Sequence, residues 1–359
     1  MSSTALPGSR GPAPRAPALV ATPARALALT VLSGAAISLQ AYVNGQLGAR
    51  IDSAWVAAAI NNLVAVVATL TVALGSGALV RGLARLRAAG ERPPLWHFVG
   101  GVVGASLVCV TTFAAPEVGV ALVTVAIVCG STLGALPVDA AGLGPAGRRP
   151  ITSPRVAGVM LAVLATAVSA LGAHGEFEPV LLGLALAVGG GQALQSAANG
   201  QLARESGEPF LASAVNTSVG LAILAVVAAI SLLVSAPDAL PSNPLLYAGG
   251  LCGAFVVVVG AAAVQTLGVL RLGLAVVAGQ TLGALAIDLA APAAGEKVTA
   301  ATVVGVLLTL VAVWVSGRAG LRRAGRSSAA GRSAAAGRSA ATERSAAMER
   351  SAAPTDERV

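Results

Sequence analysis

The chain has 359 residues, of which 56% are hydrophobic and only 11% are charged, with a formal net charge of +8 and a mean hydropathy of +0.82. Soluble domains carry roughly a quarter charged residues, so this composition excludes an ordinary soluble domain. The basic residues lie in tails and short loops rather than on one folded face, so the high pI does not indicate a nucleic-acid partner.

Apolar runs long enough to cross a bilayer recur along the chain. A helix needs about 20 apolar residues to cross the hydrocarbon layer. Loop signals such as Arg92-Pro93-Pro94 and Glu208-Pro209 separate the runs. The sequence therefore predicts an all-α polytopic membrane protein with ten transmembrane helices, at residues 26–47, 54–80, 95–114, 118–138, 155–173, 180–202, 210–235, 245–265, 271–291 and 298–317.

The distribution of arginine and lysine predicts the orientation. If the N-terminus lies inside and the ten spans alternate, 21 of the 23 basic residues fall on inner segments, and only Arg50 and Lys297 fall outside. Basic residues concentrate in the cytoplasmic loops of membrane proteins. We therefore expect both termini to be cytoplasmic.

The sequence also repeats itself. Gln40-x-x-x-Asn44-Gly-x-Leu recurs 155 residues later as Gln195-x-x-x-Asn199-Gly-x-Leu. The same offset relates Asn61 to Asn216, and an offset of 149 relates Gly100 to Gly249, Gly104 to Gly253 and Asp139 to Asp288. The two glycine pairs have the small-xxx-small spacing that permits close helix contact.

Each repeat contains five predicted helices, an odd number, so the second copy enters the membrane from the opposite side. Inverted repeats of this kind are typical of transporters, whose two halves open a central site to alternate sides. The predicted organisation is a disordered cytoplasmic N-terminus, two five-helix repeats and a disordered Arg/Ser/Ala-rich tail, at residues 1–25, 26–173, 174–317 and 318–359.

These shared positions resemble the YdcZ-like (DUF606) family of the drug/metabolite transporter superfamily. Members commonly have one five-helix unit, and this chain looks like a tandem fusion of two over residues 26–317. The resemblance implies a bacterial inner-membrane protein with an inverted five-plus-five architecture. The second half follows the family pattern at Gln280 and Asp288, whereas the first half has Ser131 in place of the glutamine. The membrane-embedded glutamate of the small multidrug members has no counterpart in the first helix, which argues against proton-coupled drug antiport.

Amide side chains are the candidate substrate-binding groups. Gln40 and Asn44 are four residues apart and therefore share one helix face, and polar groups at membrane depth usually face the protein interior. The candidates are Gln40, Asn44, Asn61, Gln195, Asn199 and Asn216, with Gln280 added by the resemblance. Such amides suit a polar or zwitterionic solute. The alternative is that they hydrogen-bond between helices and only hold the bundle together.

Asp139 and Asp288 are the acids that recur in both halves. Each lies at the C-terminal end of its predicted helix, where the helix dipole disfavours an anion. We expect a hydrogen-bond partner or cation beside them, and a role as a gate or proton site. The alternative is a solvated acid at the membrane interface.

The leading functional hypothesis is a secondary transporter or exporter of a small solute, working without ATP. Two alternatives stay open: a flippase for a lipid-linked amphipathic molecule, and a non-transporting membrane scaffold or subunit. No catalytic cluster, metal site or cofactor motif is evident, so we do not expect an enzyme. The partners expected are the lipid bilayer and a small molecule. The sequence leaves open the solute, the coupling ion and whether the chain forms a homo-oligomer.

Overall fold

The computed structural model describes residues 20, 22–90, 93–118, 120–169, 178–290 and, with gaps at 306, 309 and 313, residues 303–315. Most of the two predicted disordered tails therefore lies outside the described residues. In the described part, seven helices are long and apolar enough to cross a membrane, as a polytopic membrane protein requires.

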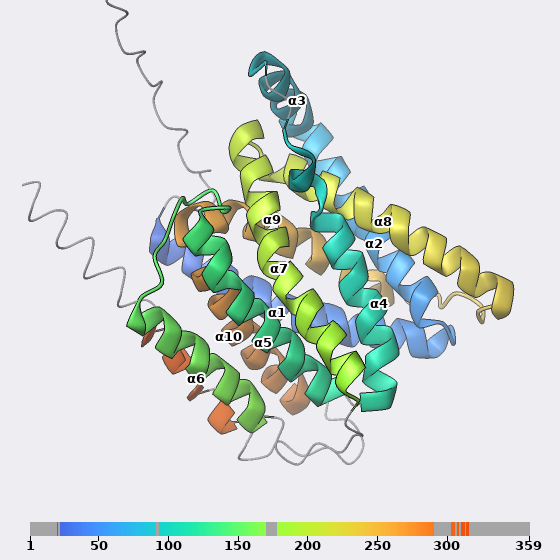
Figure 1. Ribbon diagram of the computed structural model, residues 1–359. Helices are drawn as coiled ribbons and strands as arrows, with labels where there is room; N and C mark the ends of the chain where they lie inside the picture. Colours follow the sequence, from blue (N-terminus) through green and yellow to red (C-terminus); the bar gives the residue numbers. More distant parts are fainter. Residues whose placement is uncertain are drawn as a thin grey trace, which may run out of the picture.

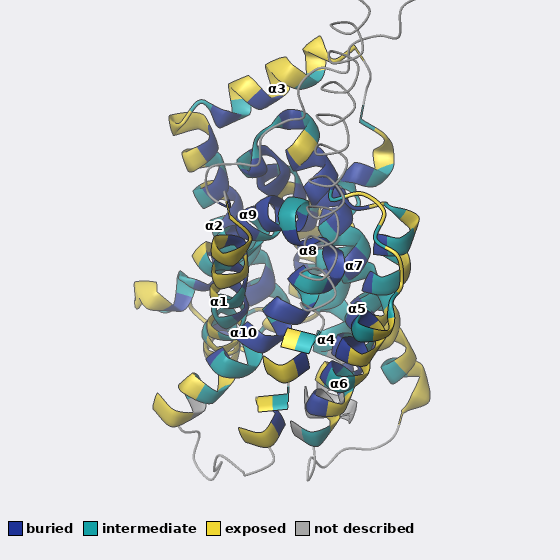
Figure 2. Cartoon of the chain, turned by 90° about the vertical axis from the view of Figure 1, so that its left-hand side faces the viewer, coloured by how far each residue is buried: buried dark blue, intermediate teal, exposed yellow. Residues whose placement is uncertain are grey.

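The helices pack as one bundle (Figure 1). Many large apolar side chains on its outer surface are exposed, including Leu74, Val226 and Leu233, as expected for faces in lipid. Buried residues concentrate between the helices, in the middle of the bundle (Figure 2). The elements are α1 (Pro23–Arg50), α2 (Ala54–Gly75), α3 (Ala78–Ala88), η2 (Leu95–Phe98), α4 (Gly100–Val118), α5 (Val120–Ala141), α6 (Ser153–Ser169), α7 (Pro179–Ser206), α8 (Pro209–Val234), η3 (Pro244–Tyr247), α9 (Gly249–Leu267) and α10 (Val269–Ala290).

Local sequence explains where four of the helices begin, α1, α2, α7 and α8. The side chains of Thr22 and Ser53 cap α1 and α2 by accepting hydrogen bonds from Arg25 N at 3.2 Å and Val56 N at 3.4 Å. A capping oxygen satisfies a backbone N–H that has no partner within the helix. The helices α1, α7 and α8 also carry proline in the first turn, where its missing N–H costs nothing.

One predicted span ends earlier than expected. The apolar run 54–80 breaks after Gly75, and Gly77 takes a left-handed backbone conformation with φ of +70°. The separate short helix α3 follows, and Arg81 pairs with Glu208 of α8 at 2.8 Å. The chain therefore turns away from the bundle and folds α3 across the end of α8.

Two close helix crossings hold the halves together, and both depend on glycine. In the α1–α10 crossing, a Cβ on Gly34 would collide with Val276 O, and one on Gly279 with Val31 O. In the α5–α7 crossing, a Cβ on Gly130 would collide with Leu186 O, and Gly189 packs equally tightly against Ile127. The positions in the two crossings differ by the offsets of 155 and 149 that relate the repeats in sequence.

The loops gather at two ends of the bundle. Asp238 N donates to Ile51 O at 3.0 Å, which places the α8–α9 loop beside the α1–α2 turn; we call this the α1–α2 end. At the opposite end, Nδ1 of His97 lies 3.2 Å from Glu205 Oε2, and Arg204 Nη1 donates to Pro145 O at 3.1 Å. This second group surrounds the turn between α7 and α8, and we call it the α7–α8 end.

Candidate functional site

The amides of the second repeat form a hydrogen-bonded group, which we call the second amide cluster (Gln195, Asn199 and Asn216). Gln195 Nε2 and Asn199 Nδ2 both donate to Asn216 Oδ1, each at 3.1 Å. The group packs on Gly100 of α4, where a Cβ would collide with the amide oxygens of Asn199 and Asn216. Gly100 therefore gives the amides room to approach α4.

The amides of the first repeat gather in the same way, in what we call the first amide cluster (Gln40, Asn44 and Asn61). They pack on α9, where a Cβ on Gly249 would collide with Asn44 Oδ1 and one on Gly253 would lie 3.1 Å from Gln40 Nε2. Asn61 Oδ1 is buried and has no hydrogen-bond partner among the described residues. This oxygen is thus a buried acceptor whose hydrogen-bonding capacity is unused within the described part of the chain.

The predicted amides therefore fall into two groups of three, each built from two helices of one half and seated on a helix of the other half. Gln280 lies apart from both. It belongs to the α1–α10 crossing, where its backbone carbonyl accepts a hydrogen bond from Ser38 Oγ at 2.7 Å. Asp288 falls in the last turn of α10, and its side chain lies outside the described residues.

An amide outside the predicted binding set lies between these clusters. Asn62 of α2 faces Gly220 of α8, where a Cβ would lie 3.3 Å from Asn62 Nδ2 and 3.5 Å from Gly101 O of α4. Three helices thus close on one another at Asn62. The Asn61-Asn62 pair marks a polar point in an apolar helix, but the sequence does not show which helix faces Asn62.

Asp139 joins the end of α5 to the start of α10. Its two carboxylate oxygens accept hydrogen bonds from Val269 N at 2.9 Å and Leu270 N at 3.2 Å, the first two amides of α10, and Arg155 Nη2 pairs with Oδ2. Asp139 is 2% exposed, so the alternative of a solvated acid is wrong for this residue. The N-terminus of α10 and Arg155 supply the favourable charge that the end of α5 does not.

The neighbouring Arg149 caps the other side of the same junction. Its guanidinium donates to Leu267 O at 2.7 Å and Thr266 O at 2.9 Å, the last carbonyls of α9, and it packs on Gly268 at φ +77°. Burial lowers the pKa of the Arg149 guanidinium, and the Asp139 carboxylate opposes that shift. Neither Arg149 nor Arg155 was among the site residues predicted from the sequence. The feature that could have indicated them is the group of arginines shortly after Asp139.

A family model described as "Putative inner membrane exporter, YdcZ" matches the chain twice, at residues 25–168 and 180–315. The chain belongs to this family. The two matched segments confirm the resemblance and its tandem two-repeat form. The description of the family supports a membrane transporter or exporter. In the part of the chain that the structure describes, no cluster of His, Cys, Asp and Glu has the make-up of a metal site.

The fold is similar to that of known structures, 23 of whose chains match. One of them, described only as a crystal structure of a protein, has a TM-score of 0.60 and 19% sequence identity, covering 83% of this chain and 96% of its own. At that identity the likeness shows the fold alone. No curated protein matches the chain.

Proposed function

We propose that the chain is a secondary exporter that moves a small solute across the bacterial inner membrane by alternating access. In this proposal it has ten spanning helices in two inverted five-helix repeats, at residues 26–173 and 174–317, with both termini in the cytoplasm. The α7–α8 end is then cytoplasmic, as the arginines of its loops favour.

The observation that carries the proposal is the direction of α2 and α8, the second helices of the two repeats. Asn62 lies beside Gly220, and four residues earlier on α2 Ala58 packs with Leu224, four residues later on α8. Equal steps in opposite directions mean that the two helices run antiparallel. Equivalent helices that run antiparallel are what an inverted repeat requires.

The helix lengths support a count of ten. Besides the seven long helices, the described residues contain three shorter apolar helices. They overlap the remaining three predicted spans, at Gly100–Thr112, Ser153–Ala165 and Val303–Ala312.

The two amide clusters are the proposed substrate-binding groups. Since Asn62 lies beside Gly220, Asn216 lies level with Val66 of α2. That level is about one and a half turns from Asn61, so both clusters approach the level where these helices cross. Amides offer donors and acceptors together without a net charge. A solute that binds there exchanges hydrogen bonds with water for hydrogen bonds with the protein, and Asn61 Oδ1 is one acceptor already in place.

Asp139 is proposed as a gate at the α7–α8 end, with Asp288 as its repeat equivalent at the other end. All three partners of the Asp139 carboxylate are donors, and they bind α5 and α6 of one repeat to α10 of the other. The Asp139→Asn variant separates a gate from a proton site. A gate predicts altered flux at every pH, a proton site predicts altered pH dependence only, and unchanged flux contradicts both.

The test of the proposal is flux through the reconstituted protein. Proteoliposomes are screened for uptake and counterflow of radiolabelled amino acids, amines and amides, with the Gln40→Ala/Gln195→Ala double variant beside the parent. Gln46→Ala is the matched control, because Gln46 is exposed on the same helix as Gln40. We expect the double variant to lose most flux and the control to keep it. A double variant that transports as well as the parent would contradict the amide site.

A further inference from the structure

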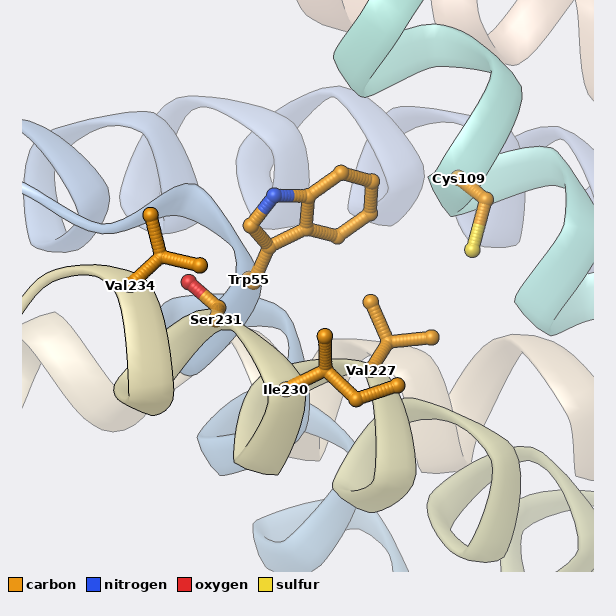
Figure 3. Close-up of a pocket in the computed structure, with 6 residues that line it drawn as sticks. All are labelled: Trp55, Cys109, Val227, Ile230, Ser231 and Val234. Carbon is orange, nitrogen blue, oxygen red and sulfur yellow. The ribbon is translucent and has the colours of Figure 1, made fainter.

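A pocket of about 360 Å³ lies between α2, α4 and α8 near the α1–α2 end. Figure 3 shows the Trp55 ring and the Cys109 thiol facing Val227 and Ile230 across it. Its volume lies within the range of small-molecule sites, roughly 300–1,000 Å³. The six lining residues are uncharged and mostly apolar: Trp55, Cys109, Val227, Ile230, Ser231 and Val234.

One helical turn deeper, the same three helices close the pocket with an apolar layer. Ala58, Ala105 and Leu224 pack together there, and Leu224 is 1% exposed. Partly buried side chains also pack against this layer, among them Val108, Cys109 and Ile223. Leu224 is its largest fully buried side chain, so opening the layer requires Leu224 to move.

Beyond that layer lies the amide level. Asn62 is seven residues from Trp55 on α2, two turns or about 10 Å along the helix, and Gly220 and Gly101 face it from α8 and α4. The pocket and Asn62 thus lie along the contact between the same three helices. A molecule about 10 Å long would reach from one to the other once Leu224 moved.

The repeat-equivalent layer toward the α7–α8 end has a different character. The offsets place Thr69, Ser213 and Ala254 there, and all three are buried. Ser213 Oγ has no hydrogen-bond partner among the described residues. In addition, α3 packs against α7 and α8 at this end, with Arg81 paired to Glu208. The apolar pocket therefore lies in the half of the α2–α8 seam that reaches the α1–α2 end.

We infer that the Trp55 pocket binds the apolar end of the exported solute, which is a neutral amphipathic molecule with an aromatic or branched aliphatic part and an amide-like head. This inference rests on the proposed export function and specifies its substrate class. The apolar walls and the indole ring favour a hydrocarbon or aromatic group. A charged head would cross the Leu224 layer without a counter-ion, which is costly.

Protection of Cys109 from alkylation tests the inference. The Cys129→Ala/Cys252→Ala variant, which keeps Cys109, is reconstituted in liposomes and treated with N-ethylmaleimide, with and without N-acetylphenylalaninamide or N-acetylleucinamide. We expect either probe to slow alkylation several-fold in a saturable way, and acetamide, which lacks the apolar part, to leave the rate unchanged. The matched control keeps Cys252 instead, a half-buried cysteine of α9 outside the pocket.

Equal slowing at Cys109 and Cys252, or no slowing by either probe, overturns the inference; the first result would mean that the probes act through the bilayer. Trp55→Ala should remove the protection, whereas Trp55→Phe, which retains a ring, should keep it. Because alkylation needs no transport, the two proposals fail separately. Protection without solute flux leaves a binding pocket but rejects the exporter. Flux that depends on Gln40 and Gln195 without protection rejects the pocket alone.

Discussion

The two amide clusters have the same sequence motif but different hydrogen bonding. In the second cluster, Asn216 Oδ1 accepts from two neighbouring amides, and both Asn199 and Asn216 are buried. In the first cluster, Asn44 is half-buried and Asn61 Oδ1 has no partner among the described residues. The same residues at equivalent positions thus stabilise the bundle in one half and leave a hydrogen-bonding group available in the other.

This difference bears on the choice between a structural and a functional role for the amides. A buried polar atom without a partner costs free energy, about 1–3 kcal/mol. A solute-binding site is expected to contain such an acceptor, which has no partner until the solute binds. The second cluster takes a similar role only if its own hydrogen bonds break, as would happen when the halves exchange conformations.

The largest expected effect is on the free energy of unfolding, which alanine substitutions should lower in the second cluster but not in the first. Asn216→Ala removes the acceptor shared by Gln195 and Asn199 and should lower the free energy of unfolding by about 2 kcal/mol. Asn61→Ala removes an oxygen with no partner among the described residues; the relief of its desolvation cost offsets the lost packing of the side chain, so the free energy should change by less than about 0.5 kcal/mol. Reversible unfolding in mixed detergent micelles measures both. Equal losses would mean that the two clusters are equally bonded.

Alanine substitutions at the glycines on which the clusters pack should lower the free energy of unfolding in the same order. A Cβ on Gly100 collides with two amide oxygens held by hydrogen bonds, so Gly100→Ala should cost about 1.5 kcal/mol in unfolding free energy through overpacking. A Cβ on Gly249 meets Asn44 Oδ1 and Asn61 Oδ1. Gly249→Ala should cost less than half of that, because Asn61 Oδ1 has no hydrogen-bond partner among the described residues to lose when it moves. Gly260→Ala is the control, since no atom lies within 4 Å of its added Cβ. A larger loss for Gly249→Ala would reverse the comparison.

The effect on solute flux should be large at Asn61 of the first cluster, where the effect on stability is small. Asn61→Ala should reduce solute flux about tenfold, equivalent to about 1.4 kcal/mol, while the protein stays folded. Asn61→Asp keeps an acceptor oxygen but replaces the amide nitrogen. It tests whether the acceptor alone is sufficient for flux. The measurement is initial-rate uptake in proteoliposomes at matched protein content. Parent-like flux in Asn61→Ala would remove the free oxygen from the site.

The smallest expected effect concerns Ser213, the repeat equivalent of Ala58. Its buried Oγ is unpartnered among the described residues, so Ser213→Ala should leave the unfolding free energy unchanged or raise it by up to about 0.5 kcal/mol. A clear loss of stability would show that the hydroxyl has a partner, such as an ordered water. Thermal unfolding monitored by circular dichroism is sufficient to measure this change.

Much of the helix pattern could be predicted from the sequence, because apolar runs and prolines determine it locally. The predicted span 180–202 corresponds to α7 (Pro179–Ser206), and the predicted span 210–235 corresponds to α8 (Pro209–Val234). The separate helix α3 was missed because the apolar run hid the Gly75-Ser76-Gly77 break. The three arginines Arg81, Arg85 and Arg87 directly after the apolar run were the available signal for an interfacial helix.

The candidate site was harder to predict, because its contacts join residues far apart in the chain. The amides could be selected by their polarity within apolar helices, but the glycines that seat them were interpreted only as helix-packing residues. Asp139 could be selected by the repeat, whereas its partners Val269 and Leu270 lie about 130 residues away. The level at which Asn62 meets Gly220 depends on the register of two helices that are apolar on every face, and hydrophobic periodicity does not determine that register.

The central claim is the inversion of the two repeats, and sided labelling tests it most directly. Ala49 and Arg204 are equivalent positions, both exposed near the ends of α1 and α7. In a background with Cys109, Cys129 and Cys252 replaced by alanine, Ala49→Cys and Arg204→Cys are treated in intact cells with a membrane-impermeant maleimide. We predict that Ala49→Cys is modified from outside, and that Arg204→Cys is modified only after permeabilisation. Modification of both from the same side would contradict the inverted repeat and the alternating-access exporter built on it.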